Sequence, residues 1–491
     1  MNLIYIIADQ MRWDALPCNG ANYIQAPYFD RLAKESINFS CLYSGNPLCV
    51  PARGILATGR YSHKCLSVEG EDRNQGAILP TTIHMAQLLR NHGFSTYGLG
   101  KFHCLPYRRN PGFDVFEVAE EGRLEMARHN GQVPSDARED YLDYLQTLGL
   151  HGLQRAHGIG NNDSRAGQSP LPLEHYVDTW ATTRSLDVLE KHIKETPDKN
   201  FFLQIGYVKP HAPYDPPAPY HNMYHPLEIP EPWGGPGDLE SRNPMMSLFP
   251  EMYLFDRMSK MAAQYSRAHY FGLISYLDSQ VGRILKFLDT HNLRDDTLVV
   301  FTSDHGDHIG DHGLFFKSFF TEGSARVPLL ISLPGQGTGQ VCDRLIGQED
   351  IVPTICELLG INIPNPIDGK SLKPLMDDPS SEHKPFVISQ FEWGANMAIM
   401  LRDKRYKYCF THFNATEELY DMQEDPHELN NLSHLSDHKP HLIHLRELAN
   451  KWCIENDHST IMADNGQLVR KDFVREDHFI DPSKVMGIRP W

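Results

Sequence analysis

Chemically capable side chains follow four short stretches of this sequence, at the point where each stretch ends. They are Asp9 and Gln10 after residues 3–8, Lys101 and His103 after residues 95–99, His211 after residues 201–208, and Asp304 and His305 after residues 297–303. Three of these stretches are continuous apolar runs bounded by turn residues, which is typical of strands buried in a parallel sheet. Because the carboxyl ends of parallel strands meet at one edge, we expect these side chains to lie together.

Two of these sets offer ligands for a metal ion. Asp9 and Asp304 supply carboxylate oxygens, Gln10 supplies an amide oxygen and His305 supplies an imidazole nitrogen. Together they are enough for a single divalent cation. Taken alone, each pair is more typical of a turn or a helix cap, so the metal site depends on the two strand ends meeting.

Cationic and imidazole groups accompany these ligands. Arg53, Lys101 and Lys317 have no obvious acidic neighbour in the sequence. His103 and His211 each lie within two residues of a lysine and could act as acid and base. The ordinary alternatives are a solvated lysine and an imidazole with a structural hydrogen bond.

The stretch NPLCVPARGILATGRYSH (46–63) places Cys49, Pro51 and Arg53 two residues apart, ahead of an apolar helical run. Pro51 suits the first turn of a helix, where a missing N–H costs nothing. Cys49 would then be a small buried residue just before it. The stretch alone leaves open whether it is only a helix start or also carries a reactive group.

The composition is that of an ordinary soluble globular protein, with 41% hydrophobic and 22% charged residues. The length of 491 residues allows a large core with a smaller partner domain. A formal net charge of −17 repels nucleic acid and anionic membranes, so we expect neither as a partner. An anionic small substrate would need a local cluster of basic groups inside this negative envelope.

The first residues, MNLIYIIADQMRWD, predict a strand. Their apolar run is too short for a signal peptide, and the basic start and the cleavage site are missing. No later stretch is long and apolar enough to span a membrane. The nine cysteines are scattered without a CxxC pair, which disfavours a disulfide framework or a zinc site. We therefore expect a cytoplasmic protein, or a periplasmic one if a signal peptide preceded this sequence.

Strands and amphipathic helices alternate along most of the chain. Helices are predicted at 81–92, 176–194 and 260–291, a further buried parallel strand at 327–333, and a long proline-rich surface excursion at 210–250. This alternation predicts an α/β fold with a mostly parallel central sheet sandwiched by helices.

A linker-like stretch near residues 375–385 divides the chain into a catalytic domain at 1–380 and a C-terminal subdomain at 381–491. In the second part, VISQFEW, MAIMLRD and RYKYCFT alternate as antiparallel strands do. A helix at about 437–453 could cover one face. We therefore expect a smaller antiparallel α+β subdomain at this end.

Several segments occur in an order that is shared with a known enzyme family. They are CVPAR followed by TGR (49–60), GKFH (100–103), KPHAPY (209–214), SDHGDHIGDHGLFFK (303–317) and ELYDMQEDPHELNNL (418–432). With them the chain resembles the Cys-type, formylglycine-dependent sulfatases of the alkaline-phosphatase-like superfamily over nearly its whole length. The resemblance implies hydrolysis of a sulfate monoester, one divalent metal, and a maturation enzyme that oxidises Cys49 to Cα-formylglycine.

The resemblance also implies a role for each residue. The aldehyde hydrates to a geminal diol, of which one hydroxyl attacks sulfur and the other later expels sulfate. The implied metal ligands are Asp9, Gln10, Asp304, His305 and the modified Cys49. The resemblance further implies that Arg53 holds the modified group and that Lys101 and Lys317 bind the sulfate oxygens. Asp304 would take the proton of the attacking hydroxyl, and His211 with Lys317 would protonate the leaving alkoxide. His103 would assist the elimination of sulfate.

Two positions depart from the commonest family pattern, which has aspartate in place of Gln10 and asparagine in place of His305. Glutamine removes one negative charge from the metal shell and histidine brings a nitrogen donor, so calcium remains the expected metal with manganese as the alternative. The same pairs resemble those of choline sulfatases and of phosphonate monoester hydrolases, and the Asp-His pair also resembles that of some carbohydrate sulfatases. A phosphonate monoester or phosphodiester hydrolase is therefore the runner-up. Lys101 and His103 favour the sulfatase.

A non-catalytic binding protein on the same scaffold is a further alternative, because a fold does not fix a function. It is disfavoured because every implied position holds a chemically competent residue. Residues beside the motifs could contact the leaving group: His63, Tyr107, Arg108, Tyr214 and His312. This set combines hydrogen-bonding groups with an aromatic platform, which suits a sugar, although another small alcohol or a phenol is also compatible.

Overall fold

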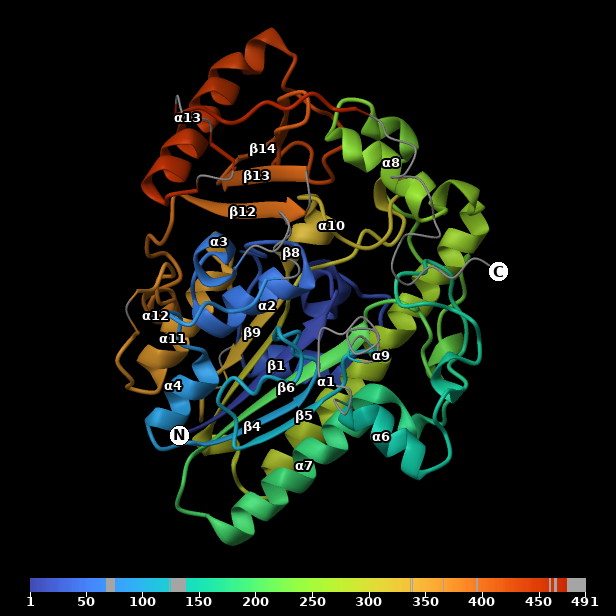
Figure 1. Cartoon of the computed structure of the whole chain (residues 1–491), viewed down its shortest axis with the longest axis vertical. Coiled ribbons are helices and arrows are strands. Elements are labelled where there is room, and N and C mark those ends of the chain that lie inside the picture. The colour runs from blue at the N-terminus through green and yellow to red at the C-terminus, as the bar shows by residue number, and fades with distance from the viewer. Residues whose placement is uncertain are drawn as a thin grey trace.

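A large central sheet with a smaller sheet above it organises the computed structural model (Figure 1). The structure describes residues 1–67, 76–122, 124, 138–335, 337, 339–364, 366–393, 396–458, 461–462 and 466–474. The central sheet has the strand order β10-β2-β9-β7-β1-β6-β4-β5. At its middle, β1 (Asn2–Asp9) pairs in parallel with β6 (Phe201–Pro210) and β7 (Thr297–Ser303).

The outer strands of this sheet are short. They are β4 (Ser95–Gly100) and β5 (Val115–Val118) on one side, and β9 (Leu329–Ser332), β2 (Ile37–Phe39) and β10 (Gln340–Cys342) on the other. β4 and β5 continue the parallel arrangement from β6. The expected mostly parallel α/β sheet is therefore confirmed.

The direction of one strand differs from the prediction. The apolar run 327–333 was expected as a parallel strand, but β9 pairs antiparallel with β7 and with β2. An unbroken apolar run shows that both faces of a strand are buried, and it carries no information on direction. The carboxyl edge at which β1, β6 and β7 end is the same whichever way β9 runs, because β9 follows β7 in the chain and leads away from that edge.

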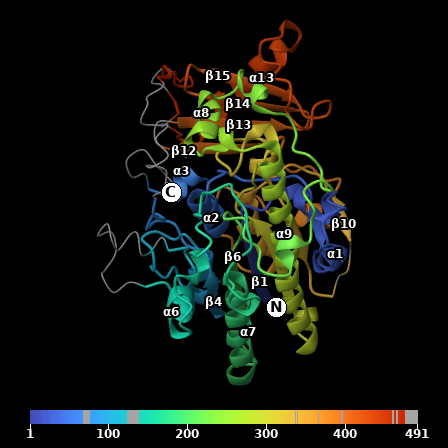
Figure 2. The same cartoon turned by 90° about the vertical axis from the view of Figure 1, so that its right-hand side faces the viewer.

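Alternate residues of β1 enter two separate cores, one on each face of the sheet. Ile4 and Ile6 pack with the helices of one face, whereas Leu3 and Tyr5 pack with those of the other. The first face is covered by α1 (Pro27–Lys34), α7 (Val177–Glu195) and α9 (Lys260–Thr290). The second is covered by α2 (Cys49–Thr58), α4 (Met85–Asn91), α11 (Ile351–Leu358) and α12 (Lys373–Asp377). Figure 2 shows α7 and α9 lying along the first face.

The expected antiparallel sheet forms the C-terminal part. It consists of β12 (Phe386–Trp393), β13 (Asn396–Asp403), β14 (Tyr406–Thr411) and β15 (Thr416–Asp421). Helix α13 (Lys439–Glu455) covers one face. The other face packs against Leu48 and Phe320, close in sequence to Cys49 and Lys317. The sheet therefore supports two segments that carry candidate site residues.

A buried ion pair network joins the same sheet to the rest of the chain. Lys407 of β14 is fully buried, and its Nζ lies 2.5 Å from Glu322 and 2.8 Å from Glu428. Glu322 begins α10 (Glu322–Ala325), the helix that follows the loop of Lys317. An ammonium held by two carboxylates in this way fixes the sheet relative to that loop.

The proline-rich segment 210–250 is more ordered than predicted. It contains α8 (Pro244–Met252), whose apolar side chains are buried against Leu314, Phe319 and Phe413. The expectation of a surface excursion is therefore wrong for its last part. Pro250 lies inside α8, and prolines at this density obscured the helical pattern in the sequence.

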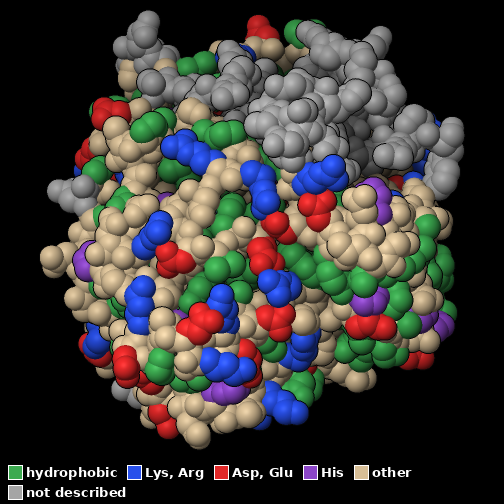
Figure 3. All heavy atoms as spheres, turned by 60° about the horizontal axis from the view of Figure 1, so that its bottom comes forward, with side chains coloured by type: hydrophobic (Ala, Val, Ile, Leu, Met, Phe, Trp, Pro, Cys, Tyr) green, Lys and Arg blue, Asp and Glu red, His purple; other side chains and the backbone are tan. Residues whose placement is uncertain are grey.

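The structure also contains a three-stranded sheet in the order β11 (Ile346–Gly347), β3 (Leu42–Tyr43) and β8 (Arg326–Val327). Two further short helices are α3 (Ser62–Cys65) and α6 (Asp140–Thr147). Within the described residues, no helix is long and apolar enough to cross a membrane. On the face shown in Figure 3, basic and acidic side chains are interspersed.

Candidate active site

The polar residues at the strand ends meet, as expected, at the carboxyl edge of the central sheet. Asp9, Cys49, Asp304 and His305 place one ligand atom each within 4.8 Å of one another, and all four are buried. Asp9 ends β1, Asp304 follows β7, and Cys49 is the first residue of α2. Among the described residues this is the one such group of His, Cys, Asp and Glu side chains.

His305 is oriented for ligation through Nε2. Its Nδ1 lies 3.0 Å from the carbonyl oxygen of Gly306, so Nδ1 carries the proton and Nε2 keeps a lone pair toward the cluster. This Nε2 lies 3.1 Å from the Cys49 Sγ, which itself is 3.9 Å from Asp9 Oδ1. The carboxylate of Asp304 is fixed by the backbone N–H groups of Gln10 and His305, at 3.0 and 2.8 Å.

Arg53 connects three strand ends. Its Nε donates to Asp304 at 2.9 Å, its Nη2 donates to Asp9 at 3.1 Å, and its Nη1 donates to the carbonyl oxygen of Lys101 at 2.6 Å. The planar guanidinium matches this arrangement, because its donors point in fixed and different directions. Arg53 lies one helical turn after Cys49 in α2, so the same helix sets both groups.

Lys101 reaches the cluster because β4 and β6 approach very closely at this point. The Lys101 N–H donates to the carbonyl oxygen of Gly206 at 2.7 Å. A Cβ on Gly206 would lie 1.9 Å from the Lys101 carbonyl oxygen, which only glycine avoids. The Lys101 Nζ then lies 2.8 Å from Asp9 Oδ2, inside the fully buried cluster.

Lys317 and His211 face each other across the site. The Lys317 Nζ lies 2.8 Å from His211 Nε2 and donates to Gln10 Oε1 at 2.7 Å. His211 Nδ1 lies 2.7 Å from the Ala212 carbonyl oxygen, so Nδ1 carries the proton and Nε2 accepts from the ammonium. Burial, with Lys317 and Lys101 nearby, lowers the pKa of His211 well below its usual value.

Gln10 is held by a second carboxylate behind the cluster. Its Nε2 donates to Asp307 at 2.5 Å, and the Tyr214 hydroxyl donates to the same carboxylate at 2.7 Å. Gln10 and His103 both adopt left-handed backbone conformations, with φ of 70° and 52°. Such conformations in residues other than glycine are costly and gather at functional sites.

Charge also distinguishes this cluster. Burial raises the pKa of the Cys49 thiol and so does Asp9, but Lys317 and His305 outweigh them, and the pKa of Cys49 is lowered. Burial likewise opposes ionisation of Asp9, yet the cations around it, Lys101 first, hold its pKa well below the usual range. Coupled, perturbed groups in one buried cluster are typical of catalytic sites.

Two carboxylates near the cluster escaped the sequence reasoning. Glu121 Oε2 lies 2.5 Å from Lys101 Nζ, and its Oε1 lies 3.7 Å from His211 Nδ1. Glu120 Oε2 lies 3.3 Å from His103 Nε2. Both follow β5 and reach the same edge as the other strand ends. The sequence signal was the run FEVAEE, in which two glutamates follow a short strand pattern.

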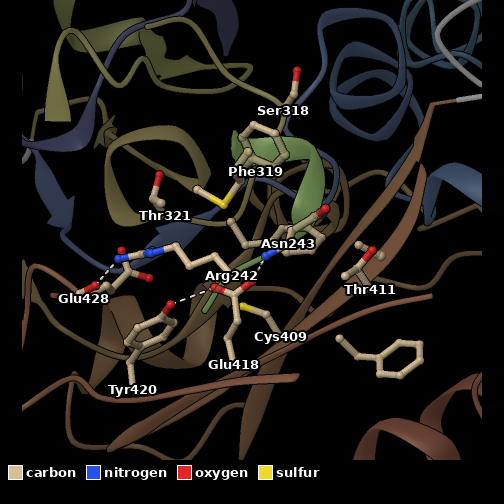
Figure 4. Close-up of a pocket in the computed structure, with 14 residues that line it drawn as sticks. Arg242, Asn243, Ser318, Phe319, Thr321, Cys409, Thr411, Glu418, Tyr420 and Glu428 are labelled. Atoms are coloured by element: carbon tan, nitrogen blue, oxygen red, sulfur yellow. Dashed lines mark hydrogen bonds between the residues drawn. The ribbon is translucent and has the colours of Figure 1, made fainter. Parts of the chain in front are cut away.

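The C-terminal sheet supports the loop of Lys317 from above. Ser318, Phe319, Arg242 and Glu418 are among the residues that line a small cavity of about 20 Å³. Figure 4 shows these four side chains. Glu418 accepts hydrogen bonds from the Tyr420 hydroxyl and from the Asn243 N–H, at 2.7 and 3.0 Å. The buried carboxylate of Glu418 therefore has hydrogen-bond partners on both oxygens.

The five residues expected near the leaving group are scattered, and the structure does not bring all of them to the cluster. Tyr107 contacts His103 ring to edge, and the exposed Arg108 pairs with Asp140. Tyr214 is buried beneath Gln10. The remaining two lie toward the C-terminal part: His63 between Gln390 and the Asn456 carbonyl oxygen, and His312 between Asp238 and Arg242.

The donor set fits a divalent cation. Two carboxylates, an amide oxygen close by and one imidazole nitrogen with a free lone pair suit a hard or borderline metal, and the burial of all four clustered residues excludes bulk water. The three cations Arg53, Lys101 and Lys317 surround the same position. The site therefore combines possible metal ligands with three cationic side chains, which suit an anionic group.

This combination, on a central parallel sheet with a C-terminal antiparallel sheet, suits an enzyme that cleaves an anionic ester with the help of a metal ion. A family model described as Sulfatase matches residues 1–361, and one described as "N-sulphoglucosamine sulphohydrolase, C-terminal" matches residues 310–452. The chain therefore belongs to the sulfatase family, whose members hydrolyse sulfuric esters and use a divalent metal and formylglycine.

Individual relatives agree with this assignment. The chain is 31% identical to an arylsulfatase of Clostridium perfringens, over 91% of this chain and 93% of that protein. It is 29% identical to a choline-sulfatase of Rhizobium meliloti, over 88% and 82%. The fold also matches the crystal structure of a phosphonate monoester hydrolase of Agrobacterium radiobacter with a TM-score of 0.78 and 23% identity, over 96% and 99% of the two chains.

Proposed function

We propose that the protein cleaves the sulfate ester of a sugar or another small alcohol or phenol, with a nucleophile derived from Cys49. The observation that carries the proposal is the position of Cys49: it begins α2, touches His305 and faces Asp9 inside the buried cluster. The helix N-terminus adds partial positive charge where an anion would bind.

Arg53 is proposed to set the shape of the site. It binds one oxygen of Asp9 and one of Asp304, and the backbone N–H groups of Gln10 and His305 bind the other oxygen of Asp304, so both carboxylates are held in position. With both carboxylates fixed in advance, no reorganisation is needed when charge develops in the transition state. Asp304 is the proposed acceptor of the proton of the attacking hydroxyl.

Lys101 and Lys317 are proposed to bind the sulfate oxygens. Lys317 also shares its proton with His211 Nε2 at 2.8 Å, so the pair can deliver a proton to the departing alkoxide. His103, backed by Glu120, is proposed to assist the release of sulfate. Lys101 and His103 follow β4, His211 follows β6, and Lys317 lies in the loop after β7.

Calcium is the proposed metal, held by Asp9, Gln10, Asp304, His305 and the modified Cys49, with manganese as the alternative because of the imidazole donor. When bound, the ion polarises an ester oxygen and offsets the negative charge of the site. The Gln10 amide donates through Nε2 to Asp307, which directs Oε1 toward the cluster side.

Substrate contacts outside the core are proposed for Tyr107 and Arg108, which follow the GKFH motif. Tyr214 acts through Asp307 and Gln10, whereas His63 and His312 belong to the packing of the C-terminal part. We further propose a reducing, cytoplasmic setting, because all nine cysteines are free thiols. A maturation enzyme is the proposed partner, because only it would convert Cys49.

The test uses protein produced together with a formylglycine-generating enzyme. The mass of the peptide spanning residues 46–60 should show conversion of Cys49, and kcat/KM should be higher for an aryl sulfate than for the matching phosphonate monoester. Cys49→Ala should abolish turnover without changing the melting temperature. Faster cleavage of the phosphonate by converted protein would instead support a phosphonate monoester hydrolase, the alternative that Gln10 and the likeness in fold favour. Full conversion without any turnover would support a binding protein.

A further inference from the structure

Glu121 places a carboxylate beside the cations of the candidate active site, which is unusual for a site that must attract a negatively charged ester. Its Oε2 lies 2.5 Å from Lys101 Nζ, and its side chain is 3% exposed. Lys101 is at the same time 2.8 Å from Asp9. The ammonium proposed to hold the ester is thus already shared by two carboxylates.

Neither contact of Glu121 is needed to complete the metal shell. Glu121 is outside the group of four clustered residues that could bind a metal. It follows the edge strand β5, and its own backbone is left-handed, with φ of 58°. Its other oxygen lies 3.7 Å from His211 Nδ1, on the far side from Lys317. A left-handed backbone at a glutamate costs free energy, so the fold holds this carboxylate here at some expense.

We propose that Glu121 selects the charge of the substrate: it admits esters that carry one negative charge and discriminates against esters that carry two. The inference rests on the proposed function, since it takes Lys101 as the residue that binds the ester oxygens. An ester oxygen that accepts a hydrogen bond from Lys101 would share its ammonium with the Glu121 carboxylate. The ester oxygen and the carboxylate would therefore lie within about 5 Å of each other.

A sulfate monoester carries one charge, whereas a phosphate monoester carries about two near neutral pH, since its second pKa is about 6. The other two cations of the site already have partners: Arg53 is bonded to Asp9, Asp304 and a carbonyl oxygen, and Lys317 to Gln10 and His211. The second charge of a phosphate therefore adds repulsion from Glu121 with little further compensation. At an effective dielectric constant of about 20, two unit charges about 5 Å apart change an affinity by more than tenfold. Glu121 therefore penalises the dianion selectively.

Glu121→Gln removes the charge and keeps the size of the side chain. The measurement is kcat/KM at pH 7 for para-nitrophenyl sulfate and for para-nitrophenyl phosphate, with fully converted Cys49. The ratio of phosphate to sulfate activity should rise at least fivefold. Glu121→Ser, which also removes the charge, should raise the ratio in the same direction and serves if the glutamine variant fails to fold.

Glu139→Gln is the matched control. Glu139 is a buried carboxyl that accepts the N–H of Gly122, next to Glu121, and burial raises its pKa to about 8. It is mostly neutral at pH 7, so its replacement by glutamine changes the pocket wall without changing its charge. The phosphate to sulfate ratio of this variant should stay within twofold of wild type.

Three outcomes would overturn the inference. The first is a ratio that rises less than fivefold in foldable Glu121 variants, and the second is an equal rise in Glu139→Gln. Both leave the proposed function intact if wild-type protein cleaves the sulfate. The third is a converted wild-type protein that cleaves neither ester, which would overturn the proposed function and this inference with it.

Discussion

Arg53→Lys tests whether the site depends on the geometry of one guanidinium rather than on its charge. Arg53 makes three hydrogen bonds, to Asp9, Asp304 and the carbonyl oxygen of Lys101. A lysine at this position keeps the positive charge, but its ammonium is a single point on a flexible stem and can replace about one of the three. Two hydrogen bonds to or from charged groups would then be lost.

Each such hydrogen bond contributes about 1.5–3 kcal/mol, so the loss is about 3–6 kcal/mol. If the site needs both carboxylates in place, kcat/KM for an aryl sulfate falls between about a hundredfold and ten-thousandfold. Calcium binding, measured by titration calorimetry, weakens in parallel, because Asp9 and Asp304 are no longer fixed before the ion arrives.

The matched control is Arg326→Lys. Arg326 is mostly buried and bonds to the Ser40 carbonyl oxygen and Glu322, away from the strand ends. It reports the general cost of replacing a buried arginine, so the melting temperature should fall while kcat/KM stays within threefold of wild type. The reasoning is refuted if Arg53→Lys retains more than a tenth of the wild-type kcat/KM.

Three further predictions address the pocket, its pH response and its support. Lys101→Ala should lower kcat/KM more than His63→Ala, because Lys101 lies in the buried cluster; the opposite order would mean that the pocket is misplaced. His84 caps α4 by accepting the Ala86 N–H, and burial lowers its pKa to about 4 from 6.5. The stability that comes from keeping His84 neutral is therefore complete above pH 6.5 and is lost as the pH falls toward 4. Asparagine at this position keeps the cap but does not titrate, so between pH 7.5 and 4 the unfolding free energy of His84→Asn, measured in urea, should fall by about 3 kcal/mol less than that of wild type. Equal losses in the two proteins would contradict this. Lys407→Met removes the ammonium between two buried carboxylates, leaving Glu322 paired with Arg326, and should destabilise the protein by about 3–5 kcal/mol, seen as a lower denaturation midpoint. A change below about 1 kcal/mol would argue against the ion pair network.

Much of the site could be predicted because strand ends in a parallel sheet converge. Asp9, Lys101, His211 and Asp304 each follow a strand, and the alternating pattern of strands and helices determines that their ends share one edge. Hydrophobic patterning could not give the direction of β9, because buried strands of either direction have the same apolar run.

Glu121 shows why the electrostatics of the site were harder to foresee. Lys101 has no acidic neighbour nearby in the sequence, yet a carboxylate 20 residues away lies 2.5 Å from its ammonium. β5 is short and only partly buried, so its pattern is weak and the residues after it did not stand out. Contacts between distant segments depend on loop paths, which neither residue type nor periodicity specifies.

The position of Cys49 has a consequence for when the protein can be matured. Cys49 is 6% exposed and every residue of α2 is buried, so a modifying enzyme cannot reach the thiol once the sheet has closed. The centre of the sheet needs β7, which ends at Ser303, about 250 residues after Cys49 in the chain. At roughly 5–20 residues per second, a ribosome needs about 10–50 seconds to supply them. Under the proposed function, Cys49 would have to be converted within that time, and slower synthesis after residue 49 would raise the fraction of active protein.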